Sequence, residues 1–267
     1  MGDGMAEPLF RIEDLRVSVA DMTRKPLFGA APRLEILKGV SFDIPRSAVL
    51  GIVGGSGSGK TTLGRTLVRL MEPTGGRIVF DGTDITHLPD ARMRPLRPRI
   101  QMIFQDPMSS LNPRLTIGRI IASPLGAGSG DRRVAQALEQ VGLPASFARR
   151  YPHELSGGQR QRVGIARAIA MRPEFILADE IVSGLDVSSQ AQVLMLLESL
   201  VKELGLTLAF ISHDLSVIRR LCDRVIVMQS GAIVEDASTA TLFASPVHAY
   251  TRELIDAIPT PDPAVRW

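Results

Sequence analysis

A glycine-rich loop of eight residues is the part of the sequence best suited to bind an anion. It reads Gly54-Gly55-Ser56-Gly57-Ser58-Gly59-Lys60-Thr61. This run matches the phosphate-loop pattern G-x-x-x-x-G-K-[ST] at every required position. Backbone N–H groups of such a loop can turn inward around a phosphate, and the dipole of a following helix adds positive charge. We expect Lys60 to reach the β- and γ-phosphates of a nucleotide and the Thr61 hydroxyl to ligate Mg²⁺. The structural alternative is a plain Gly/Ser connection between a strand and a helix.

Two adjacent carboxylates follow an apolar stretch later in the chain. Residues 175–178 predict a buried strand, and Asp179 and Glu180 come directly after it. In open α/β sheets ligands bind at the carboxyl ends of the strands, so these acids are placed to reach a bound phosphate. Asp179 could hold Mg²⁺ directly or through water, and Glu180 could orient or deprotonate an attacking water. The alternative is a strand that ends in two solvated acids.

A second candidate anion site lies at the start of a predicted helix, in Leu155-Ser156-Gly157-Gly158-Gln159. Two glycines allow a ligand to approach the backbone closely, and the serine hydroxyl and the N–H groups could bind phosphate. A chain with one phosphate loop has no obvious need for a second phosphate site, unless that site serves the nucleotide of another subunit. Alternatively, the serine is an ordinary N-cap.

The elements that must position these residues are predicted from hydrophobic periodicity and from glycine and proline signals. The expected strands are 9–19, 36–44, 49–53, 77–80, 100–104, 175–178, 207–211, 224–228 and a hairpin strand at 232–234. The expected helices are 61–70, a region from 115 to 143 broken at 126–130, 161–171, 189–204 and 215–221. Strands that alternate with helices predict a parallel sheet covered on both faces. We expect residues 89–99 to be exposed and irregular and the tail from 245 to be an appendage.

Composition sets outer limits on the function. The 267 residues suffice for one large domain or two small ones, and the net charge of +3 is a weak indication of an anionic partner. A single cysteine, Cys222, excludes an intrachain disulfide or a cysteine-based metal cluster. Residues 1–8 show no basic region followed by an apolar run, so no signal peptide is expected. No apolar run approaches the ~20 residues that span a bilayer, so any membrane role is expected to act through a partner.

Six motifs together resemble, in order and spacing, those of the ATP-hydrolysing subunits of ATP-binding-cassette (ABC) transporters. The resemblance covers about residues 9–260. The motifs are the phosphate loop, the Q-loop glutamine Gln105, the signature 155–159, Asp179 with Glu180, the D-loop Ser183-Gly184-Leu185-Asp186, and the switch histidine in Ser212-His213-Asp214. Any one of them could arise by chance, whereas all six in order identify the family.

The resemblance implies an α/β fold, namely a P-loop NTPase (RecA-like) core with an N-terminal antiparallel β-subdomain and an inserted α-helical subdomain. Residues 1–8 would be an N-terminal tail, residues 9–244 the nucleotide-binding domain and residues 245–267 a C-terminal extension. The helical subdomain would occupy about residues 106–165.

The resemblance also implies a head-to-tail dimer, in which each ATP lies between the phosphate loop of one subunit and the signature of the other. The implied catalytic residues are Glu180, His213 and Gln105. Gln105 would sense Mg²⁺ and the attacking water, and His213 would contact the γ-phosphate and support Glu180. The implied Mg²⁺ ligands are Thr61, Gln105 and Asp179. The implied ATP-binding residues are Gly54, Gly55, Ser56, Gly57, Ser58, Gly59, Lys60, Thr61, Thr62, Ser156, Gly157, Gly158, Gln159 and Asp186.

Within the family, the extended Q-loop at 104–113 resembles the oligopeptide/dipeptide/nickel importer group, and residues 151–154 and 245–251 point the same way. Members of that group act at the cytoplasmic face of the inner membrane with two permeases and an extracytoplasmic solute-binding protein. The resemblance therefore implies a peripheral ATPase that drives uptake of peptides or of related solutes such as nickel or small metal chelates, with no nucleic-acid partner. The second ATPase subunit is either a paralogue or a second copy.

Two other functions stay open. One is a subunit of a non-transport complex of the phosphonate-processing type, and the other is a soluble ABC ATPase that acts on DNA or ribosomes. The latter usually carries a long coiled-coil insertion or two cassettes. Here one cassette is present, and about 50 residues separate Gln105 from Ser156.

The chain departs from the family pattern at several positions. Residues 181–182 are Ile-Val where the family usually has Pro-Thr, and Gly55 stands where this group often has glutamate. Val19 lies near the end of the first strand, where an aromatic residue usually stacks on adenine, and Phe28 is the nearest aromatic substitute. We expect adenine recognition to be weaker or to come from another residue.

Overall fold

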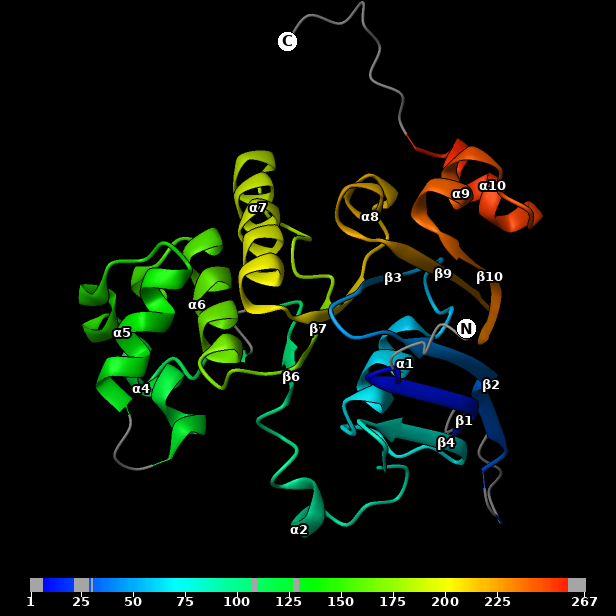
Figure 1. The fold of residues 1–267 in the computed structure, drawn as a ribbon, viewed down its shortest axis with the longest axis horizontal. Coiled ribbons are helices and arrows are strands. Elements are labelled where there is room, and N and C mark those ends of the chain that lie inside the picture. The colour runs from blue at the N-terminus through cyan, green and yellow to red at the C-terminus, as the bar shows by residue number, and fades with distance from the viewer. Residues whose placement is uncertain (1–6, 22–28, 30, 107–109, 127–129, 259–267) are drawn as a thin grey trace, which may run out of the picture.

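The computed structural model describes residues 7–21, 29, 31–106, 110–126 and 130–258, and contains two sheets with helices around them (Figure 1). The strands are β1 Phe10–Ala20, β2 Arg33–Ile44, β3 Val49–Val53, β4 Gly75–Phe80, β5 Thr83–Asp84, β6 Ile100–Ile103, β7 Phe175–Asp179, β8 Thr207–Ile211, β9 Arg224–Gln229 and β10 Ala232–Ser238. The helices are α1 Lys60–Leu67, α2 Asp90–Met93, α4 Ile117–Ala122, α5 Gly130–Gln140, α6 Gly157–Ile169, α7 Val187–Leu204, α8 Leu215–Leu221, α9 Thr239–Ala244 and α10 Ala249–Asp256. Short 3-10 turns span Ser123–Leu125, Ala145–Arg149 and Pro152–Glu154.

The larger sheet is the core of the fold. Its six strands run in the order β10-β9-β3-β8-β7-β6, and every neighbouring pair except β10–β9 is parallel. Strands β3, β7 and β8 are buried at every position, as parallel strands covered on both faces should be. Leu50 and Ile52 of β3 enter the core shared with α1, whereas Val49 and Val53 enter the core shared with α7 and α8. The predicted α/β sheet covered on both faces is confirmed.

The smaller sheet is antiparallel, with the order β2-β1-β4-β5, and it packs on the core sheet through aromatic rings. The ring of Phe10 lies 4.9 Å from that of Phe80 and 4.7 Å from that of Phe175 in β7. These centroid distances are typical of favourable aromatic pairs. The expected N-terminal antiparallel β-subdomain is therefore present and is anchored on the core.

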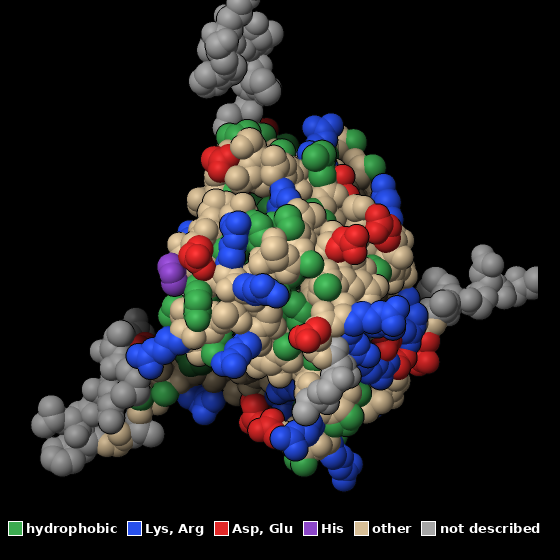
Figure 2. Space-filling view, turned by 90° about the vertical axis from the view of Figure 1, so that its left-hand side faces the viewer, with side chains coloured by type: hydrophobic (Ala, Val, Ile, Leu, Met, Phe, Trp, Pro, Cys, Tyr) green, Lys and Arg blue, Asp and Glu red, His purple; other side chains and the backbone are tan. Residues whose placement is uncertain are grey.

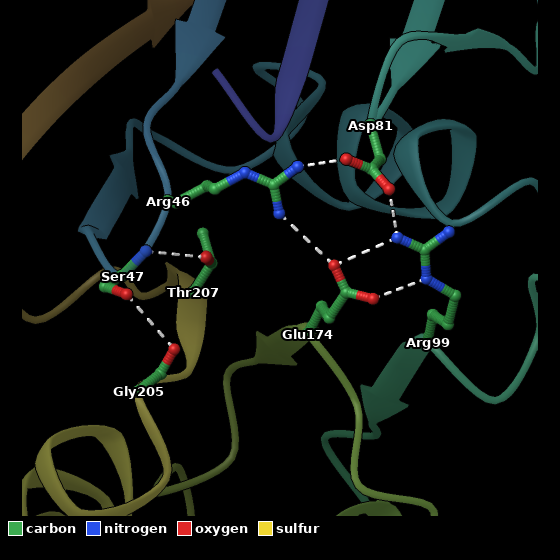
Figure 3. Close-up of polar contacts among 7 residues, drawn as sticks. All are labelled: Arg46, Ser47, Asp81, Arg99, Glu174, Gly205 and Thr207. Carbon is green, nitrogen blue, oxygen red and sulfur yellow. Dashed lines mark hydrogen bonds and ion pairs between the residues drawn. The ribbon is translucent and has the colours of Figure 1, made fainter. Parts of the chain in front are cut away.

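A network of ion pairs joins the two sheets at the amino ends of the core strands (Figure 3). Arg46 precedes β3, Arg99 precedes β6 and Glu174 precedes β7, while Asp81 follows β4. The Nε of Arg99 donates to Oε1 of Glu174 at 2.5 Å, and Nη1 of Arg46 donates to Oε2 of Glu174 at 3.3 Å. Asp81 accepts hydrogen bonds from both arginines. The network fixes the small sheet to the core at the end away from the phosphate loop.

Helices α4, α5 and α6 form a helical group beside the core sheet, between β6 and β7 in the sequence (Figure 1). Their contacts with one another are apolar: Ile121 of α4, Leu138 of α5 and Val163 of α6 are fully buried. The predicted break in the helical region agrees with the end of α4 and the start of α5, although residues 127–129 lie outside the described part. No helix in the described ranges is long and apolar enough to cross a membrane.

Several element boundaries differ from those predicted. Helix α1 ends at Leu67 rather than at residue 70, because Arg69 adopts a left-handed φ of 55°. Helix α6 begins at Gly157, four residues earlier than predicted, because Ser156 caps it. Residues 89–99 are not wholly irregular or exposed, since they contain α2 with Met93 buried.

The prediction that the tail is an appendage is wrong for residues 245–258. Helix α10 lies beside α9 and β10 (Figure 1), Thr251 is 1% exposed, and Tyr250, Leu254 and Ile255 pack against the buried core. Their spacing places Tyr250 and Leu254 one turn apart on one helical face, which prolines elsewhere in the tail obscured in the sequence. Residues 259–267 lie outside the described residues.

Candidate functional site

The phosphate loop connects β3 to α1 in a conformation that depends on glycine. Gly54, Gly57 and Gly59 have φ values of 150°, 74° and 103°, which side chains with a Cβ rarely adopt. A Cβ on Gly54 would lie 2.2 Å from the carbonyl oxygen of Met228. The hydroxyl of Ser58 is buried in the loop and has no partner among the described residues. Because buried polar groups are normally hydrogen-bonded, the loop fits a polar ligand such as phosphate.

Lys60 lies in the first turn of α1 and is folded back onto the loop. It is 7% exposed, and its Nζ donates to the carbonyl oxygens of Gly54 at 2.8 Å and of Gly55 at 2.9 Å. Burial lowers the pKa of the Lys60 ammonium, and the charges of Glu180 and Asp179 oppose that effect. A buried cation held by neutral carbonyls gains stability from an anionic ligand, so Lys60 fits a phosphate.

Thr61 and Asp179 form the part of the site suited to a hard cation. The Thr61 hydroxyl donates to Oδ1 of Asp179 at 3.4 Å, and Thr62 follows in the same helical turn. Burial, followed by the neighbouring charge of Glu180, raises the pKa of the Asp179 carboxyl, and a bound cation would offset both effects. The described residues contain no cluster of three or more His, Cys, Asp or Glu side chains able to hold a metal. Mg²⁺ fits this sparse donor set, because it takes one or two protein oxygens together with phosphate oxygens and waters.

Glu180 lies between side chains from two other strand ends. Its Oε2 accepts a hydrogen bond from Nε2 of Gln105 at 3.1 Å, and its Oε1 lies 3.5 Å from Nδ1 of His213. Its backbone φ is 48°, a left-handed value that is strained for a residue with a side chain. The Ser183 hydroxyl donates to the Glu180 carbonyl at 2.8 Å, and a cavity of about 290 Å³ opens beside Glu180, Ser183 and His213. Carboxylate, amide and imidazole groups thus meet at Glu180, beside a cavity that is large enough to admit water.

The signature residues lie apart from the phosphate loop. Ser156 caps α6 by accepting from the Gln159 N–H at 3.3 Å, and Gln159 Oε1 accepts from the Ser156 N–H at 3.0 Å. The serine is therefore an N-cap, and the two glycines present a helix N-terminus beside α7, where a Cβ on Gly158 would meet Ser189 Oγ at 3.2 Å. No hydrogen bond among the described residues joins 156–159 to the phosphate loop, and Figure 1 shows α6 in the helical group.

Asp186 and the adenine contact complete the sequence-based candidates. Asp186 caps α7 by accepting from the Ser189 N–H at 2.9 Å, and hydrogen bonds from Ser188 and Ser189 lower the pKa of its carboxyl. Val19 is 38% exposed near the end of β1, and Phe28 lies outside the described residues. Neither position therefore gives an aromatic partner for adenine within the part of the chain that the structure describes.

Sequence reasoning missed one residue at the loop. The phenol oxygen of Tyr250, in α10, accepts a hydrogen bond of 2.6 Å from the N–H of Gly55. The stretch 245–251 served only as a marker of the importer group. A tyrosine next to a candidate helix start was the available signal, but nothing local indicates a partner so far away in sequence.

Comparisons with known proteins show which family the chain resembles. A family model described as ABC transporter matches residues 37–183. A Brucella ovis protein named as a peptide import ATP-binding protein is 56% identical over 239 residues, covering 87% of this chain and 75% of that protein. The oligopeptide transport ATP-binding protein AppF of Bacillus subtilis is 50% identical over 233 residues, covering 85% of this chain and 71% of AppF.

Solved structures show the same likeness. A dimeric structure of the ATP-binding cassette MJ0796 in a post-hydrolysis state with ADP and Pi has a TM-score of 0.75 and 30% identity, covering 86% of this chain and 98% of that one. The cbiO1 protein from Clostridium perfringens, part of the transporter complex cbiONQ, has a TM-score of 0.76 and 28% identity, covering 90% of this chain and 92% of that one.

Proposed function

Because this chain belongs to the ABC transporter family of ATP-binding proteins, we propose that it is the ATP-hydrolysing subunit of an importer for peptides or closely related solutes. The observation that carries this proposal is the position of Glu180, hydrogen-bonded to Gln105 and close to His213, at the strand ends that also carry the phosphate loop. Identities of 50% and more with proteins named for peptide import favour this function over a non-transport complex or a DNA- or ribosome-acting ATPase.

The chemistry follows from the positions of the side chains. Lys60 would leave the carbonyl oxygens that now hold it and bind the β- and γ-phosphates of ATP, while Thr61, Asp179 and Gln105 would hold Mg²⁺, which neutralises phosphate charge. Glu180 would accept a proton from water as the water oxygen bonds to the γ-phosphorus and the bond to the bridging oxygen of ADP breaks. His213 and Gln105 would keep the Glu180 carboxylate in place.

The site is half of a composite site in this proposal. Ser156, Gly157, Gly158 and Gln159 present a helix N-terminus suited to an anion but lie away from the chain's own phosphate loop. They would close over the ATP of a second subunit, and Asp186 would lie at the same interface. The dimeric structure of the related cassette MJ0796 supports this arrangement. The second subunit is a paralogue or another copy of the chain.

A groove between the core and the helical group is suited to a permease. It has a volume of about 420 Å³, and Leu70, Phe104, Leu115 and Ile120 are among the residues that line it. Leu70 is 55% exposed. On the face of the molecule that carries the helical group, apolar side chains alternate with Lys and Arg and with some Asp and Glu (Figure 2). Since Phe104 precedes Gln105, a permease segment seated here would be linked to the Glu180 site and would hold the ATPase at the cytoplasmic membrane face.

Co-expression with two multi-span importer permeases from the same source tests the proposal. We expect a detergent-stable complex containing both permeases and two ATPase subunits. In vesicles this complex should take up peptides when its extracytoplasmic solute-binding protein and ATP are supplied. A stable complex with other enzymes in place of permeases, or association with DNA or ribosomes, would contradict the importer function. Nickel and small metal chelates offered as alternative solutes would define the substrate class.

A further inference from the structure

The C-terminal segment contacts the phosphate loop directly. The Oη of Tyr250 accepts from the Gly55 N–H at 2.6 Å, although the two residues are 195 positions apart. The side chain is partly buried and packs against the larger hydrophobic core, which restricts the movement of the oxygen. The contact is therefore a tertiary feature and does not follow from local chain geometry.

The support for this ring does not depend on the phosphate loop. Glu235 of β10 accepts hydrogen bonds from the N–H groups of Val247 and His248, each at 2.9 Å. Arg252 donates to the carbonyl oxygens of Pro246 and Val247 at 3.1 and 2.7 Å. The turn that leads into α10 is thus fixed on β10, and the ring is held at a set distance from the loop.

On the loop side, the contact falls on the peptide that also holds Lys60. The Gly54 carbonyl and the Gly55 N–H belong to one planar peptide unit, so fixing the direction of one fixes the other. Tyr250 holds the N–H, and the Lys60 ammonium donates to the carbonyl at 2.8 Å. The tyrosine hydroxyl therefore sets the orientation of the carbonyl against which Lys60 rests.

The absence of a side chain at position 55 is explained by the same oxygen. Gly55 does not have a left-handed φ, so its backbone would accept alanine. A Cβ built there would lie 2.9 Å from the Tyr250 Oη, the one atom beyond its chain neighbours that it would approach within 4 Å among the described residues. Glycine at 55 and tyrosine at 250 are thus a matched pair.

We propose that Tyr250 is a positioning residue of the ATP site: its hydroxyl fixes the Gly54–Gly55 peptide and, through it, Lys60 and the mouth of the phosphate loop. The turn and helix at residues 245–256 then contribute to the geometry of the nucleotide site. This inference rests on the proposed function only in taking ATP as the ligand.

Tyr250→Phe in the full chain is the direct test, because it keeps the ring and removes the oxygen. With Mg²⁺ present, we expect the Kd for a fluorescent ATP analogue to rise about 3- to 10-fold, the value of one lost hydrogen bond. In the permease complex the KM for ATP should rise similarly with kcat within about twofold. The unfolding midpoint should move by less than about 3 °C. Tyr151→Phe, which removes the hydroxyl of the chain's other tyrosine, is the control and should leave the Kd unchanged.

Gly55→Ala sharpens the test through a double-mutant cycle. Alone, it should weaken ATP binding, because the new Cβ displaces the phenol oxygen. Combined with Tyr250→Phe, it should add less than about twofold to the loss, since the hydrogen bond is already gone and the overlap is relieved. An unchanged Kd in Tyr250→Phe, or fully additive losses in the double variant, would overturn the inference.

Amide hydrogen exchange separates this inference from the proposed function. In the absence of nucleotide, the phosphate-loop peptide of Tyr250→Phe should exchange several-fold faster than that of the wild type, whatever ligand the loop takes. Equal exchange rates would refute the positioning role. A wild-type chain that failed to bind ATP while showing the exchange difference would instead refute the ATPase function and leave the Tyr250 contact in place.

Discussion

The two ends of the core sheet each carry a cluster of charged side chains, and the clusters differ in how their charges are balanced. At the amino ends, two arginines and two carboxylates are paired with one another (Figure 3). Hydrogen bonds from Arg99 lower the pKa of Asp81 and of Glu174, and the bond to Glu174 raises the pKa of Arg99. The charges of Arg99, Asp81 and Glu174 are therefore more stable in the folded chain than in water.

At the carboxyl ends of the core strands the pKa shifts have the opposite sign. Burial lowers the pKa of Lys60 and raises that of Asp179, so both ionised forms are less stable than in water. The strained backbone of Glu180 adds to this cost. The amino-end cluster is thus complete without a ligand, whereas the carboxyl-end cluster is missing its counter-charges. Functional sites are where proteins tolerate such imbalance.

The strongest way to test the comparison is to neutralise Glu180. Glu180→Gln should lower ATP turnover about 10²- to 10⁴-fold, because a general base is lost, while ATP binding persists and a closed dimer accumulates. Steady-state hydrolysis and size-exclusion chromatography with ATP measure these outcomes. Glu203→Gln, on the exposed face of α7, is the matched control. Normal turnover by Glu180→Gln would remove the catalytic role given to this carboxylate.

Removing Lys60 should separate ligand binding from stability. Lys60→Ala should weaken ATP binding about 10- to 100-fold, since it removes charge-assisted bonds to phosphate. The unliganded chain should be no less stable, because removing the desolvation cost of the buried ammonium offsets the loss of its two hydrogen bonds to the carbonyl oxygens of Gly54 and Gly55. Equilibrium titration and thermal unfolding give the two quantities, with Lys202→Ala as the matched control. Unfolding at markedly lower temperature would show that Lys60 belongs to a structural network like the one at the other end.

Neutralising a carboxylate of the amino-end cluster should lower stability and leave ATP binding unchanged. Glu174→Gln should lower the free energy of unfolding by about 1 kcal/mol, because Arg46 and Arg99 lose a charged partner in a partly exposed site. Affinity for ATP should stay within about twofold of the wild type. Glu198→Gln removes half of an isolated surface ion pair with Arg220 and should cost about 0.5 kcal/mol or less. Equal losses in the two variants would contradict a cooperative network.

The two clusters also differ in how far the sequence predicts them. Glycine-rich and acidic strand ends such as 54–61 and 179–180 carry their signal in residue type and spacing, and the parallel core followed from apolar strands. The ion-pair network and the Tyr250 contact join residues tens to hundreds of positions apart, so no local pattern indicates them. The packing of α10 was missed for the same reason, and α2 was hidden by the prolines around it. The roles of the site residues stay predictions.

The smallest expected effect is the change in the free energy of unfolding as the pH falls, and it compares the two ends of the sheet most directly. The pKa of Glu174 is lowered in the folded chain, so its contribution to stability is present above its ordinary value of 4.5 and is lost as the pH falls below it. The pKa of Asp179 is raised, so its ionisation opposes folding at neutral pH, and protonation relieves that cost as the pH falls.

Glu174→Gln should therefore destabilise and Asp179→Asn stabilise the unliganded chain at pH 7. Both differences should shrink toward about pH 4 in denaturant-unfolding series. If Asp179→Asn destabilised the chain at pH 7, the carboxyl end would be as self-sufficient as the amino end.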